Sequence, residues 1–106
     1  MDEASLKALL KTTGLPVAYH HFFVDENNPP PKPPYIVFLL SYSSNFGADD
    51  KVYNAEKNFQ VELYTIKKDP ASEKLIEDLF NGNDIYFEKA ETYIDSEGLY
   101  QVLYEI

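Results

Sequence analysis

The sequence predicts a small α+β domain: a mostly antiparallel sheet of about four to five strands with two helices packed on it. Alternating apolar and polar residues over 58–67 indicate a strand, and the capped amphipathic segment over 69–82 indicates a helix. Most links between strands are of hairpin length, which favours antiparallel pairing. With 106 residues, the chain is expected to form one domain over residues 1–106.

The first half of the chain contains one predicted helix and two predicted strands. The helix covers residues 2–13, with Asp2 or Ser5 as its cap and Gly14 as its left-handed stop. Its apolar face, at helical spacing, is made of Leu6, Leu9 and Leu10. The strands cover 17–24, either face of which fits a core, and 35–42, whose near-continuous apolar run is typical of a central strand.

Two irregular segments flank the predicted central strand. Residues 25–34 (DENNPPPKPP) are rich in proline, which forces extended backbone and excludes helix. This Pro-rich loop is interpreted as a stiff surface connection or as a docking segment for a proline-recognising domain. Residues 43–50 form a polar loop with Phe46 at its tip, and 51–55 form a short extended piece.

The strand over 58–67 has two faces of different character. One face, assigned to the core, carries Phe59, Val61, Leu63 and Thr65, and the other carries Gln60, Glu62, Tyr64 and Ile66. The second face is open to two interpretations: an ordinary solvated face, or a surface against which a neighbouring subunit packs.

The following helix has clear end signals in Asp69 as N-cap, Pro70 at its first position and Asn81-Gly82 at its close. Its buried stripe is predicted to contain Leu75, Ile76, Leu79 and Phe80, with Ser72, Glu73 and Asp78 on the exposed side. The last two strands are predicted over 84–89 and 99–106, joined through 91–98.

Composition excludes several classes of function. The chain carries 9 basic and 18 acidic residues, a net charge of −9, which argues against a nucleic-acid or anionic-membrane partner. The longest near-apolar run, 35–40, is too short to span a bilayer, and the polar start of the chain does not resemble a signal peptide. Cysteine is absent, which excludes disulfides and thiolate metal sites.

No motif for catalysis or cofactor binding stands out. His20 and His21 are neighbours on a predicted strand, so their side chains are expected on opposite faces, unsuited to one metal ion. The acidic pairs 25–26 and 49–50 lack the spaced ligands and glycine of a calcium loop. We therefore expect no metal, no cofactor and no enzyme, although a carboxylate pair brought together by the fold is not excluded.

The segment 58–82 combines Val-Glu-Leu-Tyr-Thr, Lys-Lys-Asp-Pro and an acidic helix ending in Asn-Gly. This combination resembles the small tail-terminator or tail-completion (head–tail joining) proteins of long-tailed phages and of prophages in Gram-positive bacteria. The segments LKALLKTTGLPVAYHHF, PPYIVFLLSYSSNFGADDKVY and GLYQVLYEI are similar to the opening helix, central strand and closing strand of that family. The resemblance covers nearly the whole length, and its motifs are structural rather than chemical.

The resemblance implies a non-enzymatic α+β structural protein of the phage virion tail, assembled in the cytoplasm of the bacterial host. Its copies would form an oligomeric ring, commonly a hexamer, that caps the tail tube and joins it to the head connector. The implied partners are therefore copies of the chain, the tail tube protein and the head–tail connector, with phage DNA passing through the ring without specific binding. An acidic lining suits such a channel.

Because the family offers no motif residue to carry over, the contact residues are chosen by their chemistry. Subunit or partner contacts are expected at Gln60, Glu62, Tyr64, Tyr100, Tyr104, Ser43, Asn45, Phe46, Asp49 and Asp50. Each of these positions also fits a solvated sheet face or loop. The alternative function is a small acidic interaction module, an adaptor or inhibitor, that binds a basic host protein.

Overall fold

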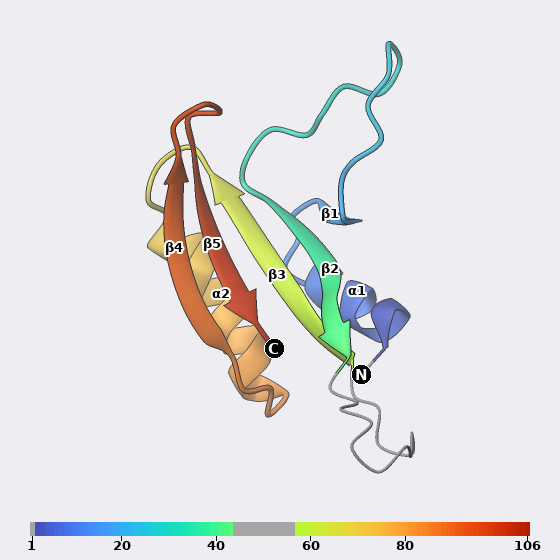
Figure 1. Ribbon diagram of the computed structural model, residues 1–106, viewed down its shortest axis with the longest axis vertical. Coiled ribbons are helices and arrows are strands. Elements are labelled where there is room, and N and C mark those ends of the chain that lie inside the picture. The colour runs from blue at the N-terminus through green and yellow to red at the C-terminus, as the bar shows by residue number, and fades with distance from the viewer. Residues whose placement is uncertain (1, 44–56) are drawn as a thin grey trace.

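The computed structural model describes residues 2–43 and 57–106 (Figure 1). The predicted order of helix, three strands, helix and two strands is confirmed. The elements are α1 (Glu3–Lys11), β1 (Val17–Tyr19), β2 (Tyr35–Ser43), β3 (Lys57–Thr65), α2 (Pro70–Gly82), β4 (Glu88–Ile94) and β5 (Leu99–Glu105).

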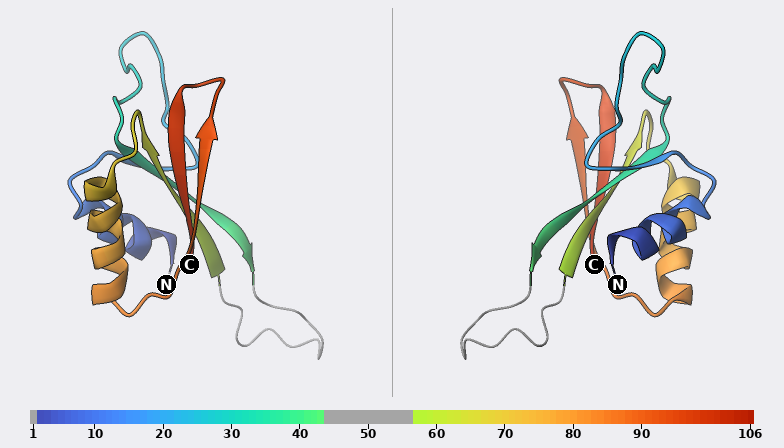
Figure 2. Two further views of the ribbon diagram at one scale, coloured as in Figure 1. Left: turned by 90° about the vertical axis from the view of Figure 1, so that its left-hand side faces the viewer. Right: turned by 90° about the vertical axis from the view of Figure 1, so that its right-hand side faces the viewer.

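The five strands form one sheet in the order β1-β2-β3-β5-β4. Among the strands of the described residues, β1 pairs in parallel with β2, and the pairs β2–β3, β3–β5 and β4–β5 are antiparallel. Both helices lie against the same face of the sheet (Figure 2). The predicted α+β class, with a mostly antiparallel sheet of five strands and two helices packed on it, is therefore confirmed.

The core lies between the helices and the sheet. Strand alternation sends every second side chain of β2, β3 and β5 toward α1 and α2. The buried cluster consists of Leu6, Leu10, Ile36, Phe38, Phe59, Val61, Leu63, Ile76, Phe80, Val102 and Tyr104. The predicted core face of β3 is thus confirmed, and Thr65 is also buried.

The N-terminal segment follows the predicted helix and stop but not the predicted strand. Asp2 caps α1 by accepting a hydrogen bond of 2.8 Å from the Ser5 amide, and Gly14 has a φ of 84°. The strand predicted over 17–24 is wrong beyond Tyr19, because His20 adopts a left-handed φ of 67° that ends the extended backbone. Residues 20–34 then form a long loop that leads from the end of β1 to the start of β2 (Figure 1).

Helix α2 begins as predicted, but its rotation differs from the prediction. Asp69 accepts a hydrogen bond of 3.1 Å from the Ser72 amide, and Pro70 occupies the first position. The prediction of exposed Ser72 and Glu73 is wrong, since they are only 6% and 4% exposed, and that of a buried Leu75 is wrong, since it is 46% exposed. The buried carboxylate of Glu73 is paired with two lysines outside the helix, Lys68 and Lys89.

The chain between α2 and β4 also departs from the prediction. Gly82 is the last residue of α2, Asn83 is its C-cap, and Asp84 has a left-handed φ of 56°. The strand predicted over 84–89 therefore starts later, at Glu88. Before it starts, Ile85 and Phe87 pack against the core, which accounts for the apolar character that suggested a strand.

Candidate functional site

The face of the sheet turned away from the helices, here called the open face, is the candidate functional site. No described helix covers it (Figure 2). The strand register places its side chains in rows, one of which runs Tyr35, Tyr64, Gln101 and Thr92, and the next Val37, Glu62, Leu103 and Ala90. Of the expected contact residues, Gln60, Glu62 and Tyr64 lie together on this face, each half-buried.

Tyr64 is the centre of a hydrogen-bonded group on the open face. Its hydroxyl donates to Oε1 of Glu62 at 2.8 Å and accepts from Nε2 of Gln101 at 2.9 Å. Burial, followed by the contact with Glu62, raises the pKa of Tyr64 to about 12. The phenol therefore stays neutral at physiological pH, and it is held in one orientation by partners on two strands.

Aromatic side chains extend this group toward the Pro-rich loop. The ring of Tyr35 lies 5.3 Å from the ring of Tyr64, tilted by 30°, and Phe22 packs edge-on against Tyr35 at 5.4 Å. These rings border a hollow of about 250 Å³ whose walls come from the 20–24 segment, the Pro-rich loop, β2, β3 and the β4–β5 turn. Burial, and secondly the negative charge of Glu97, raises the pKa of Tyr35.

Charge is unevenly distributed between the two faces. The described strand positions of the open face carry three carboxylates, Glu62, Glu88 and Glu105, and no lysine. Glu88 and Glu105 are direct cross-strand partners, a pairing that is unfavourable without a neighbouring cation. On the helix side, by contrast, Lys68 and Lys89 are paired with carboxylates. The open face therefore presents uncompensated negative charge.

Two expected contact residues do not belong to the open face. Tyr104 is fully buried and donates a hydrogen bond of 2.8 Å to Glu77, so its assignment as a contact residue is wrong. The cause is strand parity: even-numbered residues of β5 face the helices, as Tyr100 does beside Tyr93. Ser43 ends β2, while Asn45, Phe46, Asp49, Asp50 and the predicted extended piece at 51–55 lie outside the described residues.

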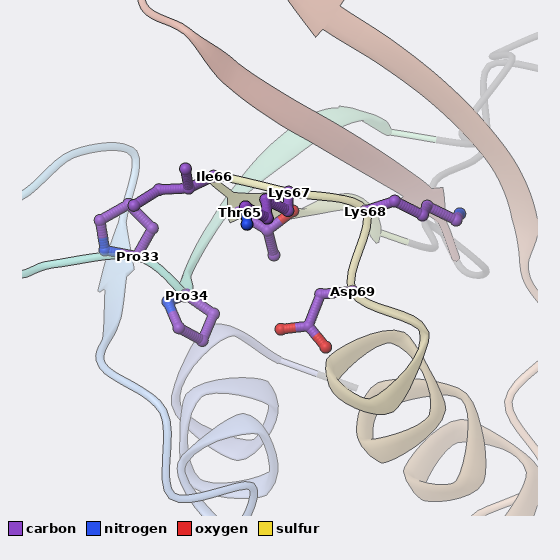
Figure 3. Close-up of a pocket in the computed structure, with 7 residues that line it drawn as sticks. All are labelled: Pro33, Pro34, Thr65, Ile66, Lys67, Lys68 and Asp69. Carbon is purple, nitrogen blue, oxygen red and sulfur yellow. The ribbon is translucent and has the colours of Figure 1, made fainter.

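A second hollow, of about 380 Å³, lies between the end of the Pro-rich loop and the β3–α2 connection (Figure 3). In Figure 3 the side chain of Lys68 points away from it, and the carboxylate of Asp69 is used to cap α2. The remaining walls include Pro33, Pro34 and Ile66, which is 60% exposed. This hollow can offer apolar contact, and Lys67 is the remaining charged residue among those that line it.

The histidine pair differs from expectation. Because the strand has ended at Tyr19, His20 and His21 do not alternate across a sheet, and their Nδ1 atoms lie 2.9 Å apart. In such a contact one Nδ1 donates and the other accepts. Among residues 2–43 and 57–106, no group of three or more potential metal-ligating side chains occurs.

Several residues of the open face were not among the expected contacts. Phe22, Tyr35, Glu97 and Gln101 come from four separate segments, and they meet only through the strand register and the position of the β4–β5 turn. Alternation within 99–106 was the only sequence signal for Gln101, and the near-continuous apolar run over 35–42 assigned Tyr35 to neither face. No signal pointed to Phe22 or Glu97.

Comparison of the chain with protein-family models, with curated proteins and with solved structures found no match. Within the part of the chain that the structure describes, no helix is both long and apolar enough to cross a membrane.

Proposed function

We propose that this chain is a non-enzymatic assembly protein that works by packing its open face against other protein subunits. The observation that carries the proposal is the row Tyr35, Tyr64 and Gln101, which is ordered by hydrogen bonds and ring contacts, is covered by neither described helix and stays partly exposed. Half-buried aromatic rings beside fixed polar groups are typical of surfaces that exclude water when a partner binds.

In its specific form, the proposal is a ring-forming tail-terminator or tail-completion protein of a long-tailed phage or prophage. This form is supported by the sequence resemblance over nearly the whole length and by the α+β fold, which is the fold that the resemblance implies. A ring needs a head-to-tail interface, in which the open face of one copy meets a different surface of the next. The ring would cap the tail tube and meet the head connector in the virion.

A second candidate is an acidic interaction module that binds a basic host protein as a monomer. The observation that favours it is the set of open-face carboxylates without lysine partners in the described residues. The two candidates differ in oligomeric state, since a ring requires self-association and an adaptor does not.

Sedimentation velocity over a wide range of concentrations, with negative-stain images of any large species, tests the proposal. We expect a closed oligomer that Tyr64→Ala weakens. Tyr86→Ala is the matched control, because Tyr86 is 79% exposed and lies outside the open face. A monomer at every concentration that also fails to co-sediment with isolated phage tail tubes would contradict the tail-terminator form and favour the adaptor.

A further inference from the structure

The hollow beside Tyr35 on the open face has the dimensions and walls of a site for one side chain. Its volume is about 250 Å³. Val37, which is 6% exposed, is one of its lining residues, and the others are His20, His21, Phe22, Val24, Pro30, Pro31, Tyr35, Tyr64 and Glu97. The site is therefore an aromatic pocket whose lining includes one carboxylate and two histidines.

The rings of the pocket are fixed rather than free to collapse into it. Tyr64 is held through its hydroxyl by Glu62 and Gln101, and Tyr35 is held between Tyr64 and Phe22 by ring contacts of 5.3 and 5.4 Å. Fixed aromatic faces attract cations through their π electrons, and they do so more strongly where water is excluded.

The carboxylates near the pocket lack cations of their own. Among residues 2–43 and 57–106, neither Glu62 nor Glu97 forms an ion pair, whereas Glu73, Glu77 and Glu91 are all paired with lysines. Glu97 is one of the residues that line the pocket, and Glu62 accepts a hydrogen bond from the hydroxyl of Tyr64. The pocket thus combines aromatic walls with negative charge that the described residues leave unpaired.

We propose that this pocket binds the guanidinium group of an arginine presented by a different protein. Guanidinium is planar and weakly hydrated, so it stacks on aromatic rings and bonds a carboxylate at the same time, which an ammonium group does less well. The sequence contains no arginine, so a second copy of the chain cannot supply the group. Tyr35 and Tyr64 also belong to the row proposed above as a contact surface, so this inference rests on the form of that proposal in which the open face meets a different protein.

The test uses saturation-transfer difference NMR of the whole protein with the peptide acetyl-Gly-Arg-Gly-amide, which works for a monomer and for a large assembly. Matched peptides carry lysine, or the neutral isostere citrulline, in place of arginine. We expect saturable binding of the arginine peptide, at least threefold weaker binding of the lysine peptide, and no binding of the citrulline peptide. Equal binding of the arginine and citrulline peptides would overturn the proposal, and equal binding of the arginine and lysine peptides would overturn the choice of guanidinium.

Two substitutions locate the site. Glu97→Gln removes the carboxylate that lines the pocket, and Glu105→Gln makes the same change of charge on the open face but outside the pocket. Both residues are exposed, so both variants are expected to fold. We expect Glu97→Gln to weaken arginine binding at least threefold and Glu105→Gln to leave it unchanged. Equal weakening by both would show general attraction to an acidic surface and would overturn the pocket assignment.

Discussion

The Nζ atom of Lys89 on β4 lies 2.7 Å from Oε1 of Glu73 on α2, and Glu73 is only 4% exposed. Lys68 also contacts this carboxylate, with its Nζ 2.8 Å from Oε2 and 3.0 Å from Oε1. Oε2 of Glu73 accepts no hydrogen bond, so the contact between Lys68 and Oε2 is a charge–charge interaction only. The Nζ atom of Lys89 also lies 2.8 Å from Oε2 of Glu77, a second carboxylate of α2. Both carboxylates are therefore linked to the β4 edge of the sheet. Helix α2 is thus attached to β4 by charge, where β2 and β3 attach to the helices by apolar packing.

The first prediction concerns this ionic layer. Glu73→Ala leaves two lysines without their shared partner, and breaking a buried pair in this way is strongly destabilising. The side chains of Lys68 and Lys89 are 48% and 35% exposed, so water can solvate them after the partner is lost. We therefore expect a loss of about 2–3 kcal/mol in the free energy of unfolding, less than the loss usual for breaking a fully buried ion pair. The measurement is urea denaturation. Asp78→Ala is the control, since its pair with Lys74 is solvent-exposed and should cost less than about 0.5 kcal/mol. Equal losses in the two variants would contradict the buried role of Glu73.

The pKa of Glu73 leads to a prediction of how the stability of the protein depends on pH. Burial raises the pKa of Glu73, but hydrogen bonds from Lys68 and Lys89 outweigh burial, so the net pKa is lowered from its ordinary value of 4.5. A lowered pKa in the folded state stabilises the protein above pH 4.5, and this stabilisation is lost as the pH falls through the folded-state value. The stability difference between the wild type and Glu73→Gln should therefore be constant near neutral pH and shrink in acid. A difference that is unchanged in acid would argue against ionised Glu73 as the source.

The rotation of α2 is tested by two neighbouring residues. Ile76 is fully buried, while Leu75 is 46% exposed. Ile76→Ala should cost about 2–4 kcal/mol, as expected for a large-to-small change in a core. Leu75→Ala should cost less than about 1 kcal/mol, because little apolar surface is uncovered. Thermal or urea unfolding of the two variants is sufficient. A larger loss for Leu75→Ala would restore the helix rotation predicted from the sequence.

The fold was largely predictable because its elements carry local signals. Alternation marked both faces of β3, the Asp69-Pro70 pair marked the start of α2, and Gly14 marked the turn after α1. These signals depend only on neighbours in the chain. The errors arose where distant residues decide the local structure. Glu73 fits an exposed helix position until Lys68 and Lys89 are placed beside it.

The candidate site was predictable only in part. The open face of β3 followed from alternation, so Gln60, Glu62 and Tyr64 were placed on one face, and their role as contacts stays a prediction. The aromatic pocket depends on the cross-strand register that sets Tyr35 beside Tyr64, and on a turn that places Glu97 among its lining residues. Neither relationship is encoded within a short stretch of sequence. Tyr104 was misplaced because the parity of β5 leaves open which face meets the helices.

The last prediction concerns the hydroxyl of Tyr64 on the open face. The pKa of Tyr64 is raised to about 12 mainly by burial and secondly by Glu62. The carboxylate of Glu62 accepts a hydrogen bond of 2.8 Å from the Tyr64 hydroxyl. In Glu62→Gln the charge is lost but the burial remains, so the pKa should fall yet stay above the ordinary value of 10. Carbon-13 NMR of labelled tyrosine rings measures it, with Tyr64→Phe to assign the signal. Glu105→Gln, which makes the same change of charge without touching Tyr64, should leave the pKa at about 12. An unshifted Tyr64 in the wild type would show that its ring is solvated, and it would remove the fixed wall on which the proposed arginine site depends.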